Sequence, residues 1–191
     1  MITSQFILFF FAFLVICFLV IGMINWDLRD KRYLSTMGCL MSVMLIVCAC
    51  FFPFPYQDEL LETMIADGEG LANNFIPFHT IISIFSDAIT YHAYGTLCYQ
   101  FFGNILLFIP LGFSLYCYLK EDKKFIRMLC SVIAITVFVE IWQWVFNAML
   151  QVNYRCVDVD DIILNTIGGI LGFCIASFGI SMLKSFFGKN K

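Results

Sequence analysis

Charged side chains are scarce in this sequence. Of its 191 residues only 13% are Asp, Glu, Lys or Arg, whereas soluble domains carry about a quarter. Apolar residues make up 61%, with 23 phenylalanines, and the mean hydropathy is +0.89. This composition excludes an ordinary soluble domain and favours an integral membrane protein with an all-helical fold.

Several other signals are missing as well. The sequence has no basic tract interleaved with aromatic residues, which excludes a typical nucleic-acid-binding surface. It has no CxxC pair, so a structural zinc site is not expected, and no cofactor is indicated. The nine cysteines are odd in number and mostly sit inside apolar runs, which is not typical of a disulfide framework. Only Cys98 and Cys156 lie near one predicted face, and whether they pair is left open.

Five stretches are long and apolar enough to cross a membrane, which takes about 20 residues. The first lacks a basic leading region and a small-residue cleavage site, so we predict a retained span and not a signal peptide. The predicted spans are Met1 to Ile24, Arg32 to about Pro55, about Leu97 to Leu119, Phe125 to about Met149, and about Ile162 to Leu183.

The basic residues predict the orientation. Ten of the 11 Lys and Arg residues fall on the side that holds the first and third connections and the C-terminal tail, and only Arg155 lies opposite. Basic loops stay in the cytoplasm. We therefore predict a polytopic bundle in a bacterial plasma membrane, with the N-terminus outside and the C-terminus inside. Its predicted parts are two N-terminal spans (1–55), an acidic extracytoplasmic segment (56–96) and a three-span core (97–191).

The long outer segment has a pattern of its own. Gln57 to Ala66 has helical spacing, and Ile76 to Ile89 is apolar but interrupted by polar residues. This predicts an interfacial helix or a re-entrant piece within a cap on the outer leaflet, the alternative being an ordinary acidic loop. Asn74 and Pro77 are predicted to fix the turn that seats this cap.

Polar residues occur inside the predicted spans, where they are costly. Glu140, Gln143 and Asn147 share one helix face because they are spaced i, i+3 and i+7. Glu140 lies roughly 20 Å from the inner face at ~1.5 Å per residue, in the outer half of the bilayer. Asn104 and Asn165 lie at similar depth in neighbouring spans. Small residues nearby are predicted to allow close helix packing: Gly103, Gly112, Gly168, Gly169, Gly172, Ala176 and Gly179.

Four charged residues precede or open the fifth span: Arg155, Asp158, Asp160 and Asp161. The aspartates could bind a divalent cation, or they could cap the helix and form a salt bridge with Arg155. Glu140 could act as a general acid or base, or it could hold helices together. The predicted functional cluster comprises Asn104, Glu140, Gln143, Arg155, Asp158, Asp160, Asp161 and Asn165.

Four strings, in this order, carry a resemblance: Asn74-Phe-Ile-Pro-Phe78, Gly103-Asn-Ile-Leu-Leu-Phe-Ile-Pro-Leu-Gly112, Glu140-Ile-Trp-Gln143 and Arg155-Cys-Val-Asp-Val-Asp-Asp-Ile-Ile-Leu-Asn-Thr-Ile-Gly-Gly169. Over about residues 70 to 180 the chain resembles the VanZ family of small bacterial membrane proteins. The resemblance implies a role in the cell envelope and, for some members, low-level resistance to glycopeptide antibiotics such as teicoplanin. It assigns no catalytic residue.

Three functions are compatible with these patterns. The first is binding or altering an amphiphile at the outer leaflet, with an anionic head group on Arg155 and the buried amides. Membrane lipids, a lipid-linked cell-wall precursor or a lipoglycopeptide would be the partner. The second is a membrane enzyme that uses Glu140 and the aspartates on a lipid head group. The third is a structural partner of other envelope proteins, recognised through the small residues of the fifth span.

Overall fold

The computed structural model describes residues 31–55, 57–66, 72–120 and 122–188, and this part of the chain is helical. The predicted first span from Met1 to Ile24 lies outside it, as do Arg29, Lys189 and Lys191 and the acidic pair Asp67 and Glu69. The helices are α2 (Lys31–Phe51), α3 (Asp58–Ala66), α4 (His79–Tyr91), α5 (Tyr94–Leu97), the π-helical η2 (Cys98–Phe102), α6 (Gly103–Tyr118), α7 (Lys124–Leu150) and α8 (Val159–Gly188).

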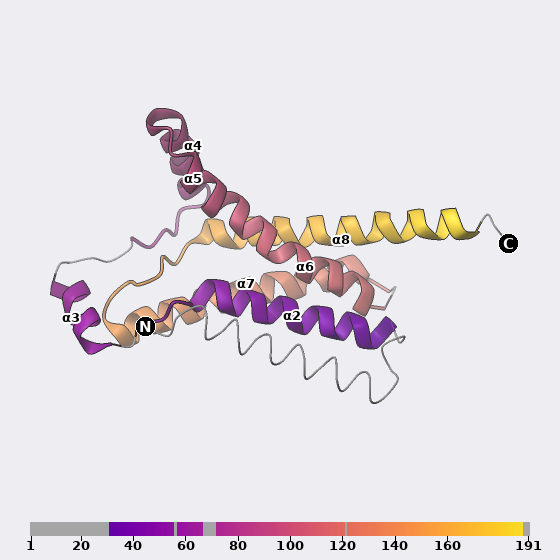
Figure 1. The fold of residues 1–191 in the computed structure, drawn as a ribbon, viewed down its shortest axis with the longest axis horizontal. Coiled ribbons are helices and arrows are strands. Elements are labelled where there is room, and N and C mark those ends of the chain that lie inside the picture. The colour runs from indigo at the N-terminus through magenta and orange to yellow at the C-terminus, as the bar shows by residue number, and fades with distance from the viewer. Residues whose placement is uncertain (1–30, 56, 67–71, 121, 189–191) are drawn as a thin grey trace.

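Among the described residues, four helices are long and apolar enough to cross a membrane: Arg32–Phe51, Tyr94–Tyr118, Lys124–Leu150 and Val159–Phe186. They confirm the predicted all-helical membrane bundle. The span through α5, η2 and α6 begins three residues earlier than Leu97, the predicted start. In Figure 1 the spans alternate in direction, so α2 and α7 begin at the end of the bundle where α6 and α8 finish. The number of spans in the whole chain and their orientation stay predictions.

The closest helix contact joins α6 and α8, which cross in Figure 1. A Cβ added to Gly168 would lie 2.1 Å from the Ile105 carbonyl oxygen, and one on Gly172 would lie 2.0 Å from that of Ile109. From the other side, a Cβ on Gly112 would lie 2.0 Å from the Gly169 carbonyl oxygen. Only glycine permits this approach of two backbones.

Not every small residue has this role. A Cβ on Gly103 or on Gly179 would meet no atom within 4 Å, so the predicted close packing at these two positions is wrong. Gly103 borders the cavity next to α6, and Gly179 lies in the C-terminal third of α8.

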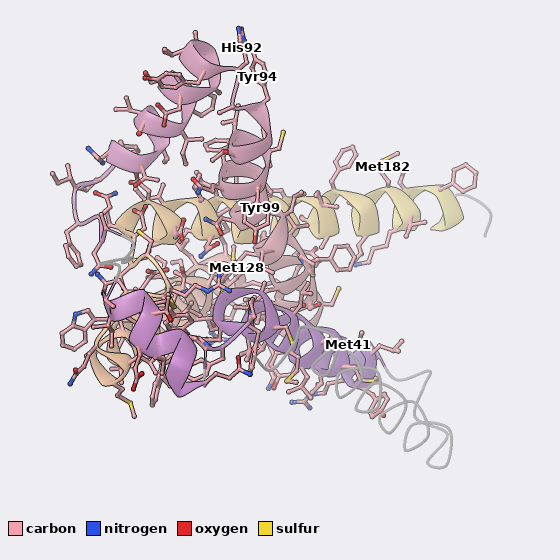
Figure 2. All side chains as sticks on the ribbon, turned by 60° about the vertical axis from the view of Figure 1, so that its left-hand side comes forward. Met41, His92, Tyr94, Tyr99, Met128 and Met182 are labelled. Atoms are coloured by element: carbon pink, nitrogen blue, oxygen red, sulfur yellow. The ribbon has the colours of Figure 1, made fainter. Side chains whose placement is uncertain are left out.

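The core of the bundle is apolar and lies between α2, α6 and α7. Its most deeply buried side chains are Ile46, Phe108, Leu111, Met128 and Val132. Figure 2 shows Met128 in the middle of the bundle, while Met182 lies toward the exposed end of α8. Many Leu, Ile and Phe side chains point outward instead. Such a pattern fits helices whose surroundings are lipid.

A tight turn starts α4. Pro77 and Phe78 are its central residues, and the His79 amide donates to the Ile76 carbonyl oxygen at 3.2 Å. Phe78 has φ 67° and ψ 0°, the left-handed conformation that the second central residue of a type II turn requires. Helix α4 then leaves the bundle at an angle and returns through α5 (Figure 1), with His92 and Tyr94 at the far tip (Figure 2).

Candidate functional site

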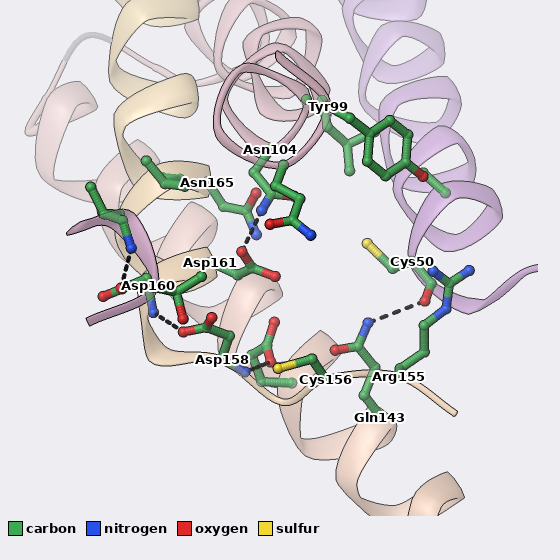
Figure 3. Close-up of a pocket in the computed structure, with 18 of the residues that line it drawn as sticks. Cys50, Tyr99, Asn104, Gln143, Arg155, Cys156, Asp158, Asp160, Asp161 and Asn165 are labelled. Atoms are coloured by element: carbon green, nitrogen blue, oxygen red, sulfur yellow. Dashed lines mark hydrogen bonds between the residues drawn. The ribbon is translucent and has the colours of Figure 1, made fainter. Parts of the chain in front are cut away.

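A cavity of about 380 Å³ lies where α2 ends and α8 begins. Its walls come from α2, α4, η2, α6, α7, the start of α8 and the connection before α8. All eight residues of the predicted functional cluster line it (Figure 3), together with Ala49, Cys50, Thr80, Ile81, Ile84, Tyr99, Gln100, Gly103, Leu107, Cys156 and Leu164. The first and last residues of the predicted cluster, Asn104 and Asn165, are 61 positions apart in the sequence, and the structure brings them to the same cavity.

Asp158 joins three parts of the site. Its Oδ1 accepts the Asp160 amide at 2.8 Å, so Asp158 is the N-cap of α8. The same oxygen accepts a hydrogen bond of 2.8 Å from the Asn74 side-chain amide. The Asp158 backbone amide donates to Glu140 Oε2 at 3.0 Å. Asp158 therefore connects the cap turn, α7 and α8.

Asp160 is the second residue of α8 and is fully buried, and its carboxylate binds the start of α4. Its Oδ1 accepts the Phe78 amide and its Oδ2 accepts the Ile81 amide at 3.1 Å. These amides are among those that a helix N-terminus leaves without intrahelical partners. A carboxylate there is favoured by the helix dipole. Asp160 thus ties the protruding helix to the bundle.

Asp161 and Asn104 link the two glycine-packed helices inside the cavity. The Asn104 side-chain amide donates to Asp161 Oδ1. Asn165, one turn further along α8, donates to the Thr136 hydroxyl at 3.0 Å. These two contacts hold polar groups of α6, α7 and α8 in one wall of the cavity.

Two amide oxygens of the site have no hydrogen-bond partner in the described part of the chain: Gln143 Oε1 and Asn165 Oδ1. Gln143 is 6% exposed and Asn165 is 2% exposed. Gln143 Nε2 donates to the Cys50 carbonyl oxygen at 3.1 Å. An unpaired buried polar group costs about 1–3 kcal/mol, so a hydrogen-bond donor placed beside either oxygen would stabilise the protein.

Arg155 holds the connection between α7 and α8. Its Nη2 donates to the Phe52 carbonyl oxygen at 2.6 Å, and its backbone carbonyl accepts the Asn147 side-chain amide at 2.7 Å. Within the described ranges no carboxylate lies within 4.0 Å of its guanidinium. The described structure thus contains the helix cap but not the salt bridge of that alternative, because the guanidinium turns toward the Phe52 carbonyl after α2.

The three aspartates do not converge on one point. Asp158 faces Asn74, Asp160 faces the start of α4, and Asp161 faces Asn104. No group of three His, Cys, Asp or Glu side chains in the residues that the structure covers is placed to hold a metal ion. The carboxylates serve as hydrogen-bond acceptors for three different elements.

Two side chains of the connection before α8, Tyr154 and Cys156, have raised pKa values. Burial, reinforced by the negative charge of Asp158, raises the pKa of the Cys156 thiol to about 11. Burial also raises the pKa of the Tyr154 hydroxyl. Cys156 and Cys98 are both free cysteines, and the Cys156 thiol donates to the Ala72 carbonyl oxygen at 2.9 Å. The Cys156 thiol is therefore neutral at physiological pH.

A second hollow of about 320 Å³ adjoins the cavity. Glu140 and Asp158 contribute to the walls of both, and the rest of the second hollow is apolar. Its other lining residues are Phe75, Val137, Ile141, Trp144, Val157, Val159 and Ile162. A polar chamber and an apolar hollow thus lie on either side of the contact between Glu140 and Asp158.

Some residues of the site were not predicted from the sequence. Thr136 lies one turn before Glu140, so the i, i+4 spacing could have placed it on the same face. Tyr99 and Gln100 lie in η2, a π-helical segment that has no sequence signal of its own. π-Helical turns are frequent at functional sites.

The comparisons with known proteins agree with the motifs that line this cavity. No curated protein and no solved structure matches the chain. A family model described as VanZ/LLP1 matches residues 39–182, which is most of the chain and includes all four candidate membrane spans in whole or in part. The glycine contact, the cap turn and every residue of the cavity lie within that range, and the chain belongs to the VanZ/LLP1 family.

Proposed function

We propose that this VanZ-family protein acts at the outer leaflet of a bacterial plasma membrane by binding the head group of an amphiphile. The candidates are a phospholipid, a lipid-linked cell-wall precursor and a lipoglycopeptide antibiotic. Through this binding the protein would contribute to low-level resistance to glycopeptides such as teicoplanin. The observation that carries the proposal is the cavity of about 380 Å³ with buried, unpartnered amide oxygens in its wall.

The position of the cavity supports this proposal. It lies at the end of the bundle opposite the start of α7 and the end of α6, where Lys120, Lys123 and Arg127 are found. Basic residues mark the cytoplasmic side of membrane proteins. The cavity then faces the outer leaflet, where cell-wall precursors and antibiotics meet the membrane.

The neighbouring apolar hollow supports an amphiphilic ligand. Binding sites for small molecules are largely apolar with a few convergent polar groups. Here the polar groups gather on one side of Glu140, and Ile141 and Trp144 line the hollow on the other side. A ligand with a polar head and an apolar tail matches this arrangement better than a purely polar one does.

Most of the small residues on which the structural-partner hypothesis relies already pack inside this chain. Gly168 and Gly172 face the backbone of α6 in the same chain. These glycines are therefore covered and do not offer a tight-packing face to another protein. The amphiphile hypothesis needs no such surface.

Resistance measurements test the proposal. The gene is expressed in a glycopeptide-susceptible host, and the inhibitory concentration of teicoplanin is compared for the wild type and for Glu140→Gln, Arg155→Ala and Asp161→Ala. We expect these variants to lose the protection at unchanged protein levels. Ser131→Ala is the matched control, since the one hydrogen bond of the Ser131 side chain in the described structure goes to the Arg127 carbonyl of its own helix, at the end of α7 far from the cavity. Full protection by all three cavity variants would refute the proposal.

A membrane enzyme acting on a lipid head group is the second candidate. Glu140 favours it, because it is buried in the cavity wall and only its Oε2 has a hydrogen-bond partner among the described residues. The other oxygen is available to a ligand or a proton. Incubation of the purified protein with outer-leaflet lipids, with and without a chelator, decides between the two: unchanged lipid masses argue for binding alone.

A further inference from the structure

The cavity wall is rich in hydrogen-bond acceptors. Gln143 Oε1 has no partner in the described structure, and its orientation is fixed because Nε2 donates to the Cys50 carbonyl, which can only accept. Asn165 Oδ1 is the other unpartnered amide oxygen. Both residues are more than nine-tenths buried and line the cavity. The complement of such a surface is a ligand that donates hydrogen bonds.

The charges of the wall point in the same direction. Glu140 and Asp161 each have a hydrogen bond to one carboxylate oxygen only, counted over the residues that the structure describes. Asp158 and Asp160 line the cavity as well, and Arg155 is the single basic residue among the described residues of the wall. A bare anion would meet more negative than positive groups here. A cation that donates several hydrogen bonds satisfies both the charges and the acceptors.

Arg155 completes the recognition of a zwitterion. Among the described residues, only the Phe52 carbonyl oxygen accepts a hydrogen bond from its side chain. Figure 3 shows Arg155 beside Cys50 on one side of the cavity, with Asp158, Asp160 and Asp161 on the other side. A head group that carries a phosphate and an amine can place the phosphate near the guanidinium and the amine near the carboxylates.

From these contacts we infer that the cavity selects a zwitterionic phosphate head group with a protonated primary amine, presented by a membrane lipid. This inference rests on the proposed function, because it names the class of amphiphile that the same cavity binds. In this inference the ammonium group lies among Glu140, Asp161 and Gln143, and it donates to the carboxylate oxygens of Glu140 and Asp161 that have no partner in the described structure.

Four lipids with identical dioleoyl chains test the inference. Phosphatidylethanolamine has both the charge and the N–H donors, phosphatidylcholine keeps the charge without the donors, and N-acetyl-phosphatidylethanolamine and phosphatidylglycerol lack the charge. Native mass spectrometry of the full-length protein in detergent gives the affinity of each. We expect phosphatidylethanolamine to bind at least tenfold more tightly than the other three lipids.

The outcomes separate this inference from the proposed function. Equal or tighter binding of phosphatidylglycerol or of the N-acetyl lipid would overturn the amine selection and leave head-group binding in place. Binding of none of the four lipids would overturn the inference, and the resistance measurements described above would then decide the proposed function. Glycerophosphoethanolamine, which has the same head group but no acyl chains, tests whether the ligand is a lipid. If it displaces phosphatidylethanolamine only in at least hundredfold excess, the ligand is a lipid. Displacement at equal concentration overturns that assignment.

Variants connect the preference to the cavity. Glu140→Gln and Asp161→Asn each remove one carboxylate, and we expect each to reduce the ratio of phosphatidylethanolamine to phosphatidylglycerol affinity at least threefold. Two variants are used because either one alone could fail to fold. Ser131→Ala, far from the cavity on α7, leaves the ratio unchanged. An unchanged ratio in both folded cavity variants contradicts the inference.

Discussion

The side-chain amide of Asn74 donates a buried hydrogen bond of 2.8 Å to the carboxylate of Asp158, 84 residues later in the chain. The backbones of the two residues also form a short parallel bridge, in which the Asn74 amide donates to the Val157 carbonyl and the Val159 amide to that of Asn74. This contact joins the cap turn to the N-terminus of α8. The shape of the cavity therefore depends on a turn outside the spans.

Asn74→Ala should destabilise the protein. The substitution removes one of the two donors to Asp158 Oδ1, and a buried hydrogen bond to a charged group is worth about 1.5–3 kcal/mol. We expect a lower midpoint of thermal unfolding in detergent. Asn153→Ala is the control, because Asn153 is only half-buried and has no such contact in the described structure. Equal midpoints for the two variants would contradict the role given to Asn74.

Gly172→Ala should separate α6 and α8. The new methyl group would start 2.0 Å from the Ile109 carbonyl oxygen, so the helices have to move apart. Overpacking of this kind costs about 1–3 kcal/mol. Gly179→Ala on the same helix meets no atom within 4 Å and should keep or slightly raise the stability, because alanine favours helices. Thermal unfolding of both variants checks this, and a tolerated Gly172→Ala would count against the backbone contact.

The Cys156 thiol should react slowly with iodoacetamide. Its pKa is raised to about 11, so the reactive thiolate is about a hundredfold less populated at neutral pH than that of a thiol with a pKa of 9.0. In a protein that keeps only this cysteine, the alkylation rate should still rise between pH 9 and pH 10. Glutathione provides the reference under the same conditions. A rate that levels off by pH 9.5 would show that the thiol is not shielded as described.

The predicted orientation can be tested with single cysteines in a cysteine-free background. Gln151→Cys lies directly after α7, at the opposite end of that helix from Asp122→Cys, which lies in the connection between α6 and α7. Both positions are exposed. A maleimide that cannot cross membranes should label Gln151→Cys in intact cells and should label Asp122→Cys only after lysis. The reverse pattern would invert the topology and move the cavity to the cytoplasmic side.

The sequence predicted the spans and the polar cluster for simple physical reasons. Charge is so costly in a bilayer that long uncharged stretches identify the helices. The spacing of Glu140 and Gln143 fixes their common face whatever surrounds them. Contacts of Asp160 with the amides of Phe78 and Ile81 could not be predicted, because a backbone donor has no residue-specific signal and lies about 80 positions away. The same holds for Gln143 and the Cys50 carbonyl.

The glycine contact between α6 and α8 also limits how the proposed lipid ligand could reach the cavity. With the Ile105 and Ile109 carbonyl oxygens against the glycines of α8, an acyl chain has no room to pass between these two helices. That side of the protein acts as a closed wall one turn below Asn104. Any such ligand would therefore have to enter from another side, where the wall includes Thr80, Ile81 and Ile84 of the protruding helix α4, which Asp160 fastens to the bundle.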